Sequence, residues 1–185
     1  MCGPQWKGMV AILYFENDAL AIRDLCPADV APIVAGEIAQ GWLGACAEKY
    51  EMRLRDAAAG RSIALCAAWS GEPVGYVNVY FQAGVPFDRT GWPEIVDFGV
   101  LESFRQRGIG TALLDTAERL AAQRSDTVCL GVGLHSGYGA AQRLYVRRGY
   151  IPDGTGVWYR DQNLAPYAPC VNDDDLVLWL SKRLR

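Results

Sequence analysis

The spacing of apolar residues alternates along the chain between the helical period and the two-residue period of strands. Pro27 opens a stretch in which Val30, Ile33, Val34 and Ile38 recur at helical spacing, so we expect a helix with this face turned inward. The same period predicts helices over residues 45–59, 108–122 and 139–148. Short apolar or alternating runs predict strands over residues 19–26, 62–69, 74–81, 94–101, 127–134, 157–159 and 176–180.

This order of elements is typical of a mixed α/β protein with three layers, α-β-α. We predict a central mixed sheet of about seven strands that is mostly antiparallel. The turn residues 70–73 predict a hairpin, and Gly99 lies inside a strand, which indicates a bulge or the close approach of another backbone. We expect a single domain over residues 1–185, with an N-terminal extension over residues 1–18 and a core over about residues 19–184; Met9 is an alternative start.

Composition narrows the function classes. The chain has 185 residues and a net charge of −3, so it lacks the basic footprint of a nucleic-acid-binding protein. Its six cysteines include no Cys-x-x-Cys pair, which gives no support to a zinc or redox site, and we expect no metal. No apolar run has the length of a membrane span, and the apolar opening lacks the small-residue cleavage region of a signal peptide. We therefore predict a cytoplasmic protein that binds neither membrane nor nucleic acid.

A candidate anion site follows the strand that ends near residue 101. The start of a helix offers backbone N–H groups without internal partners and a partial positive charge. Glycines let the backbone approach a ligand closely, and arginines add formal charge beside these donors. Diphosphate is the ligand that best matches this combination, although a tight turn with solvated arginines is the simpler alternative. The candidate residues are Arg105, Gln106, Arg107, Gly108, Ile109, Gly110 and Thr111.

This loop resembles the cofactor loop of the GNAT family of N-acetyltransferases, Arg/Gln-x-x-Gly-x-Gly/Ala, at every position of residues 105–110. The later family block, a small residue followed by Leu-Tyr and then Gly-aromatic, is similar to residues 141–150, with Tyr145 and Gly149 in their places. The order of elements also resembles the family over about residues 19–184. One departure is Tyr138, where the family often has Asn.

The resemblance implies a GNAT-like acyl-CoA N-acyltransferase fold that binds acetyl-CoA as co-substrate. In this family the strand before the loop splays from its neighbour, and its backbone pairs with the pantetheine arm. Phe98, Gly99 and Val100 are then candidates for pantetheine contacts, and the N–H of Val100 is a candidate oxyanion donor. The acceptor is expected to be the amine of a small molecule, a peptide or a protein, and a homodimer is possible, as is common in the family.

The resemblance also implies that Tyr145 contacts the CoA sulfur. A phenol with a pKa of about 10 is a weaker acid than a thiol with a pKa of about 8.5, a difference of roughly 2 kcal/mol. We therefore expect Tyr145 to stabilise the leaving thiolate by a hydrogen bond; packing in the core is the alternative. Asp97 and Glu94 are candidates for the base that deprotonates the acceptor amine. We favour Asp97, which stands in an apolar run, and alternation along the strand would turn Glu94 to the opposite face.

Three other interpretations remain. A non-catalytic acyl-CoA-binding sensor with the same fold would tend to lose Tyr145. A nicotinamide-dinucleotide enzyme is suggested by residues 131–137, but their glycine spacing is one residue too long and they lie late in the chain. His135 and Ser136 suggest a hydrolase, but no nucleophile elbow surrounds Ser136.

Overall fold

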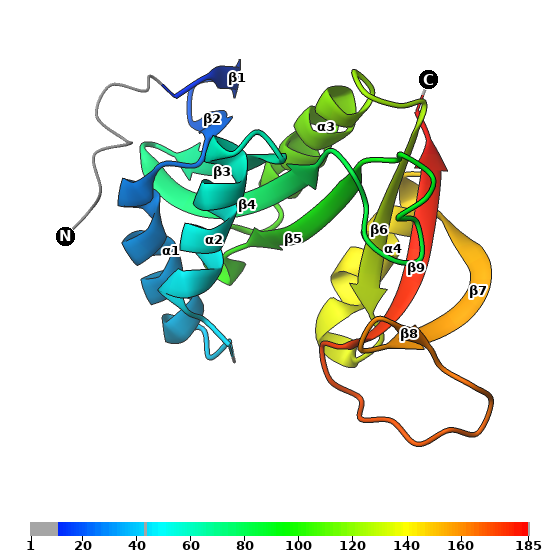
Figure 1. Ribbon diagram of the computed structural model, residues 1–185. Helices are drawn as coiled ribbons and strands as arrows, with labels where there is room; N and C mark the ends of the chain where they lie inside the picture. Colours follow the sequence, from blue (N-terminus) through cyan, green and yellow to red (C-terminus); the bar gives the residue numbers. More distant parts are fainter. Residues whose placement is uncertain (1–10, 43, 185) are drawn as a thin grey trace. The chain divides into compact units, whose positions relative to one another are not determined.

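The structure is a computed structural model, which describes residues 11–42 and 44–184 and is shown as a ribbon in Figure 1. The chain forms two compact units. The first contains residues up to Asn78 together with Asp97–Thr116, and the second contains Val79–Val96 together with Ala117–Arg185. Both alternative starts, Met1 and Met9, lie outside the described residues, and the single acyltransferase domain stays a prediction.

The first unit consists of two helices and a set of strands, with part of a third helix. Strands β1, β2 and β3 are neighbours in this order, and both pairs are antiparallel. The elements are β1 (Leu13–Glu16), β2 (Leu20–Asp24), α1 (Pro27–Ala39), α2 (Ala47–Ala58), β3 (Ser62–Trp69), most of β4 (Glu72–Tyr80), the second part of β5 (Glu94–Val100) and the first part of α3 (Ile109–Ala121).

Local chemistry explains where these elements begin and turn. Pro27 occupies the first turn of α1, where its missing N–H costs nothing, and the Asp29 carboxylate accepts the Cys26 N–H at 2.8 Å. The predicted hairpin between β3 and β4 is confirmed. Its turn places Ser70 and Gly71 at φ values of 49° and 87°, the left-handed pair that suits a two-residue hairpin.

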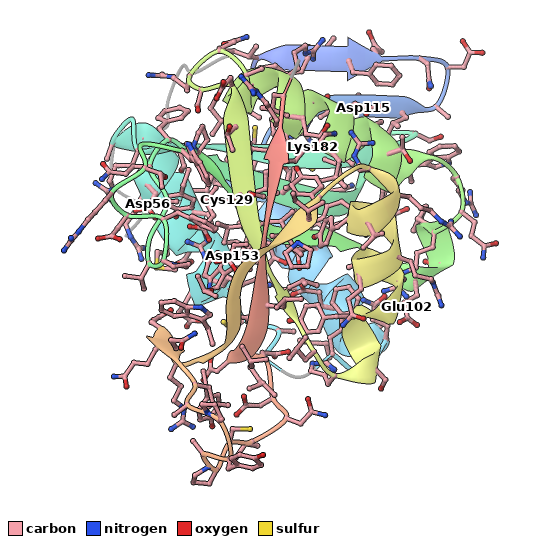
Figure 2. All side chains as sticks on the ribbon, turned by 90° about the vertical axis from the view of Figure 1, so that its right-hand side faces the viewer. Asp56, Glu102, Asp115, Cys129, Asp153 and Lys182 are labelled. Carbon is pink, nitrogen blue, oxygen red and sulfur yellow. The ribbon has the colours of Figure 1, made fainter. Side chains whose placement is uncertain are left out.

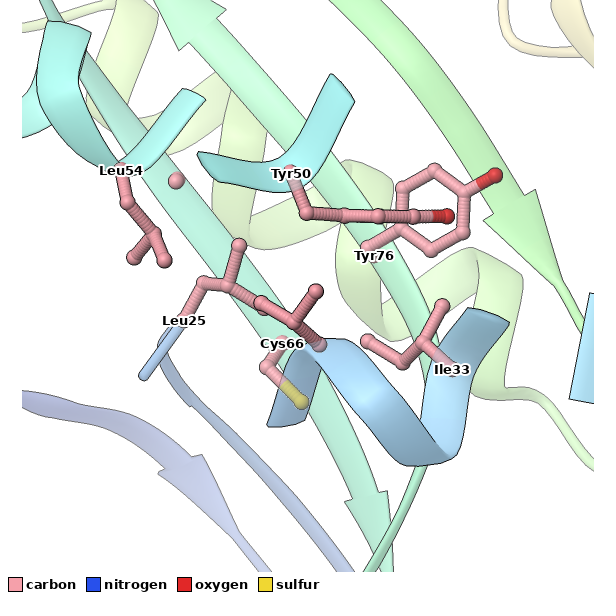
Figure 3. Packing of buried hydrophobic residues seen from close by; sticks show 8 residues of the cluster. Leu25, Ile33, Tyr50, Leu54, Cys66 and Tyr76 are labelled. Atoms are coloured by element: carbon pink, nitrogen blue, oxygen red, sulfur yellow. The ribbon is translucent and has the colours of Figure 1, made fainter. Parts of the chain in front are cut away.

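The core of the first unit has α1 and α2 packed on one face of the strands. Val30 and Ile33 of α1 and Leu54 of α2 cluster with Cys66 of β3 and Tyr76 of β4 (Figure 3). The opposite face of β4 carries Gly75. A Cβ there would lie 2.9 Å from the Gly99 carbonyl oxygen and 3.3 Å from Leu113 of α3. Helices therefore cover both faces of β4, as the three-layer prediction requires.

The second unit contains the C-terminal strands. β6 pairs antiparallel with β9, and β9 pairs antiparallel with β7. β5 joins β6 in parallel with a register pair at Glu94 and Cys129, and the full strand order is β1-β2-β3-β4-β5-β6-β9-β7-β8. The elements are β6 (Thr127–Gly133), α4 (Gly139–Arg147), β7 (Ile151–Tyr159), β8 (Gln162–Asn163) and β9 (Leu176–Arg183).

The mixed, mostly antiparallel fold class is confirmed, and two details are corrected. The described residues form nine strands rather than about seven, because β1 and β8 pair as short strands too small for a clear apolar pattern. Ile38 was expected on the inner face of α1, but it is 62% exposed. Its neighbour Glu37 faces inward instead, with only 1% exposed, because its carboxylate has hydrogen-bond donors inside the unit. Among residues 11–42 and 44–184, no helix is long and apolar enough to span a membrane.

Candidate functional site

The loop between β5 and α3 contains two residues with left-handed backbone. After a short 3-10 turn, η2 (Glu102–Phe104), Gln106 has a φ of 63° and Gly108 a φ of 79°. Left-handed residues that alternate with right-handed ones are the backbone pattern in which successive N–H groups can form a concave anion site. Gln106 is not a glycine, so its left-handed backbone is costly and must be held by the residues around it.

Helix α3 begins directly after this turn. The Gly108 carbonyl accepts the Ala112 N–H at 3.0 Å, so the preceding N–H groups of the loop and first turn have no partner within the helix. Gly110 lies in this first turn, and a Cβ there would come within 3.1 Å of the Phe98 ring on β5. Glycine thus lets the helix start pack directly against the strand. The structure brings these predicted cofactor residues together in the first unit.

The guanidinium groups of the two loop arginines contact backbone carbonyls and aromatic rings. The Arg105 Nε donates to the Val100 carbonyl at 3.3 Å, and its guanidinium lies 5.7 Å from the Trp42 ring centre. The Arg107 guanidinium lies 5.4 Å from the Trp69 ring centre and donates to the Ser103 carbonyl at 3.3 Å. Both guanidinium groups therefore lie beside the loop backbone, and that of Arg105 is also paired with the Glu102 carboxylate at 3.3 Å.

The break in β5 differs from the predicted one. The left-handed residue is Asp97, with a φ of 54°, whereas Gly99 is absent from the positive-φ residues. Gly99 is required for another reason, because a Cβ would lie 2.8–3.1 Å from the ring and hydroxyl of Tyr76. The close neighbour of Gly99 is therefore the side chain of Tyr76 rather than another backbone, and a bulge at this residue stays a prediction. The turn at Asp97 also interrupts the simple alternation that was expected between Glu94 and Asp97.

The two carboxylates predicted as bases have different surroundings. The Asp97 carboxylate is half-buried and accepts the Arg53 Nε at 2.6 Å, so a charge pair holds it to α2. The Glu94 carboxylate accepts the Gly84 N–H at 3.1 Å in the second unit. Each has a structural partner, and which of them serves as a base stays a prediction.

Tyr145 lies on α4 in the second unit and is 6% exposed. Its ring contacts that of Tyr150 edge to face at 5.7 Å, so the hydrophobic surroundings expected for a core residue are present. Burial, and to a lesser degree Tyr138, raise the pKa of the Tyr145 hydroxyl above its usual value. At neutral pH this hydroxyl keeps its proton and can donate a hydrogen bond.

A buried ion cluster fixes the end of the helix that carries Tyr145. The Glu118 carboxylate accepts Arg148 at 3.0 and 2.8 Å and Lys182 at 2.6 Å; Figure 2 labels Lys182 on β9. Burial raises the pKa of Glu118, but the hydrogen bonds from Arg148 and Lys182 outweigh it, and the pKa lies below its usual value. Arg148 caps α4, so this carboxylate holds α4 to α3 and β9.

The end of β6 is closed by polar contacts that argue against a hydrolase. The His135 Nδ1 accepts the Gly137 N–H at 3.1 Å, so neutral His135 carries its proton on Nε2 and donates it to Asp174 at 2.9 Å. No lone pair of the imidazole is left to activate Ser136. The Tyr138 hydroxyl also donates to Asp174, at 2.9 Å, and the Tyr138 ring covers Gly133.

The sequence interpretation missed Glu37. Its Oε1 accepts hydrogen bonds from Tyr50 at 2.7 Å, Tyr76 at 2.6 Å and Lys49 at 3.3 Å. A signal was present, because Glu37 continues the spacing of Val30 and Ile33 on the apolar face of the predicted helix. A charged residue at such a position needs partners from elsewhere in the fold, and these cannot be identified from spacing alone.

A mixed, mostly antiparallel sheet in which a glycine-containing turn joins a strand to the start of a helix is consistent with the acyl-CoA N-acyltransferase fold. The sequence model of the acetyltransferase (GNAT) family matches residues 35–150, more than half of the chain. The chain belongs to this family.

Solved structures share the fold at low sequence identity. The apo form of RimL, a ribosomal α-N-protein acetyltransferase, is 14% identical with a TM-score of 0.70, over 95% of this chain and 96% of RimL. Ard1 from Thermoplasma volcanium is 18% identical with a TM-score of 0.66, over 90% of this chain and 99% of Ard1. A RimL complex with coenzyme A is 12% identical with a TM-score of 0.67, over 94% of this chain and 98% of RimL. No curated protein sequence matches the chain.

Proposed function

We propose that this protein transfers an acetyl group from acetyl-CoA to a primary amine, by direct attack of the amine in a ternary complex. The observation that carries this proposal is the loop from Arg105 to Gly110, with its left-handed Gln106 and Gly108, immediately before the start of α3. Family membership supports acetyl transfer in general, and the related RimL binds coenzyme A.

In this proposal the loop binds the diphosphate of acetyl-CoA. The N–H groups of residues 106–111 donate to its oxygens, and Arg105 and Arg107 add positive charge. The backbone of Phe98, Gly99 and Val100 pairs with the pantetheine arm, and the Val100 N–H donates to the oxyanion of the tetrahedral intermediate. The start of α3 packs closely on β5 where Gly110 meets Phe98. This contact supports the proposal that the diphosphate and the pantetheine arm bind to elements that are fixed to each other.

The chemical step follows from the ionisation states of the groups involved. The acceptor amine loses a proton, its nitrogen bonds to the thioester carbonyl carbon, and the carbon–sulfur bond breaks. Tyr145 donates a hydrogen bond to the sulfur as negative charge develops there. Because burial raises the pKa of Tyr145, complete proton transfer to the thiolate is unfavourable, and stabilisation by the hydrogen bond is the better-supported role.

Acetyl-CoA binding by isothermal titration calorimetry tests the cofactor assignment, with NADPH as the control ligand. Selective binding of acetyl-CoA supports the proposal. Selective binding of NADPH would instead favour a nicotinamide-dinucleotide enzyme. A panel of spermidine, an aminoglycoside and a peptide with a free N-terminus, followed by thiol release, then tests turnover. Binding without acetylation of any amine in an extended panel would favour an acyl-CoA sensor.

A further inference from the structure

Three carboxylates in the described parts of the two units are almost fully buried, and one differs from the others. Asp29 is paired through both oxygens with Arg23, at 2.7 and 2.8 Å. Glu118 is likewise paired through both oxygens, with Arg148 and Lys182. Glu37 receives all three of its donors on Oε1, while its Oε2 is buried without a hydrogen-bond partner. Such a group is costly to keep and calls for a functional explanation.

The donors around Glu37 differ in what else they touch. Tyr50 and Tyr76 both donate to Oε1, and their rings meet at 4.9 Å and nearly at right angles (Figure 3). The three atoms nearest to the missing Cβ of Gly99, including the Tyr76 hydroxyl at 2.9 Å, all belong to Tyr76. Tyr76 thus connects the buried carboxylate to the strand assigned to the thioester arm.

Tyr76 cannot act as a base by itself. Burial, followed by the hydrogen bond to Glu37, raises the pKa of the Tyr76 hydroxyl, so it is protonated at neutral pH. A proton that arrives on its oxygen must therefore displace its own proton toward Glu37, which lies 2.6 Å away. The other charged groups near this pair are Lys49, whose Nζ lies 3.3 Å from the Tyr76 hydroxyl, and Asp97, which is neutralised by Arg53.

We propose that Tyr76 and Glu37 form a proton relay for the acceptor amine, with Tyr76 as the catalytic residue beside Gly99 and Glu37 as the positioning residue that receives the proton. This inference rests on the proposed acetyl transfer. It assigns the base function to Glu37, whose Oε1 accepts the Tyr76 hydroxyl at 2.6 Å, rather than to Asp97, which is held by Arg53, or to Glu94, which is bonded to Gly84.

The proton and bond changes balance. The acceptor ammonium gives one proton to the Tyr76 oxygen, while the Tyr76 hydroxyl proton passes to Glu37. The neutral amine attacks the thioester carbon, the nitrogen–carbon bond forms and the carbon–sulfur bond breaks. The second nitrogen proton leaves with the thiolate as free coenzyme A, and Glu37 releases its proton to solvent after the amide product departs. Acetyl-CoA and the ammonium thus yield the amide, the free thiol and one proton.

The matched pair Tyr76→Phe and Tyr50→Phe tests the relay. Each change removes one hydroxyl and one hydrogen bond to the same Glu37 oxygen, and each keeps the ring. For the panel amine that the parent acetylates fastest, we expect Tyr76→Phe to lower kcat by about 100-fold, the usual contribution of a general base. Tyr50→Phe should stay within about 3-fold of the parent, and acetyl-CoA affinity should be unchanged in both. Glu37→Gln, which cannot take up the proton, should resemble Tyr76→Phe.

The pH profile separates a relay from a packing role. Without the relay, the enzyme depends on amine that is already neutral, whose fraction rises with pH up to the amine pKa of about 10. The deficit of Tyr76→Phe should therefore shrink between about pH 6.5 and about pH 9.5. Equal losses in the two tyrosine variants, or a deficit that does not change with pH, would overturn the relay while leaving acetyl transfer intact. A parent that acetylates no amine would overturn the proposed function and the relay together.

Discussion

Glu118→Gln provides the sharpest test of how the helix carrying Tyr145 is held. The parent carboxylate is 8% exposed and receives three charge-assisted hydrogen bonds, at 3.0, 2.8 and 2.6 Å. The amide keeps the size of the side chain but removes the negative charge, and its NH₂ group faces cations where an oxygen accepted from them. Arg148 and Lys182, both mostly buried, are then left without a counter-charge.

The expected loss follows from that uncompensated charge. Breaking a buried ion pair by removing one partner typically costs about 3–5 kcal/mol. For a chain of this size, 1 kcal/mol corresponds to a change of about 2–4 °C in melting temperature, so we expect a decrease of roughly 6–20 °C. Asp126→Asn is the control, because the Asp126 carboxylate forms an exposed pair with Arg183 in the same unit, and its loss should stay within about 0.5 kcal/mol.

The pH dependence gives this prediction a second, independent test. The pKa of Glu118 is lowered in the folded state, so its stabilisation is fully present above the unfolded-state pKa of about 4.3. The stabilisation is lost as the pH falls through the lower folded-state pKa. Urea unfolding of parent and variant at several pH values should therefore show a gap that is large at pH 7 and narrows in acid. A gap below about 1 kcal/mol at pH 7, or one that is independent of pH, would refute the assigned role.

Three further predictions concern the candidate site. Gly108→Ala should weaken acetyl-CoA binding by about 10-fold in calorimetry and lower the free energy of unfolding by about 1 kcal/mol, because alanine is strained at a positive φ. The control Gly91→Ala, at a similar φ of 70°, should lower stability by a similar amount and leave binding unchanged. Equal affinity in both variants would contradict the diphosphate assignment. Tyr145→Phe should lower kcat about 10- to 100-fold with unchanged acetyl-CoA affinity, whereas the buried Tyr150→Phe should retain most of the activity; a Tyr145→Phe enzyme as fast as the parent would remove Tyr145 from the mechanism. Asp97→Asn should lower the urea midpoint by weakening the pair with Arg53, and its kcat should fall less than that of Glu37→Gln; the reverse order would favour Asp97 as the base.

The turn between β5 and α3 was predictable because the residues that indicate it are close together in the sequence. Paired arginines, two glycines and the following helical period lie within one short stretch, and each residue type has a direct physical reason to be there. The structure adds that Gln106, rather than a glycine, takes a left-handed conformation beside Gly108. Spacing does not reveal this, because glutamine has no particular preference for that conformation.

The surroundings of the candidate base were not predictable for the opposite reason. Glu37, Tyr50 and Tyr76 come from α1, α2 and β4, and their contact depends on how these elements pack. The apolar period of α1 assigned Ile38 to the inside, although two hydroxyls were available to stabilise a carboxylate one residue earlier. Hydrophobicity therefore gave the right helix and the wrong inner residue.

The same reasoning explains why Asp97 was the favoured base. A carboxylate in an apolar strand next to the expected thioester is a reasonable candidate when only the sequence is known. In the folded unit, however, Asp97 is paired with Arg53, while Glu37 accepts a hydrogen bond from the Tyr76 hydroxyl, which also lies beside Gly99. In the proposed relay the Tyr76 proton passes to Oε1, the oxygen that already accepts its hydrogen bond at 2.6 Å, so the decisive property is this contact rather than a place on the strand. That contact depends on how α1 and β4 pack, and the three atoms nearest to the missing Cβ of Gly99 also belong to Tyr76.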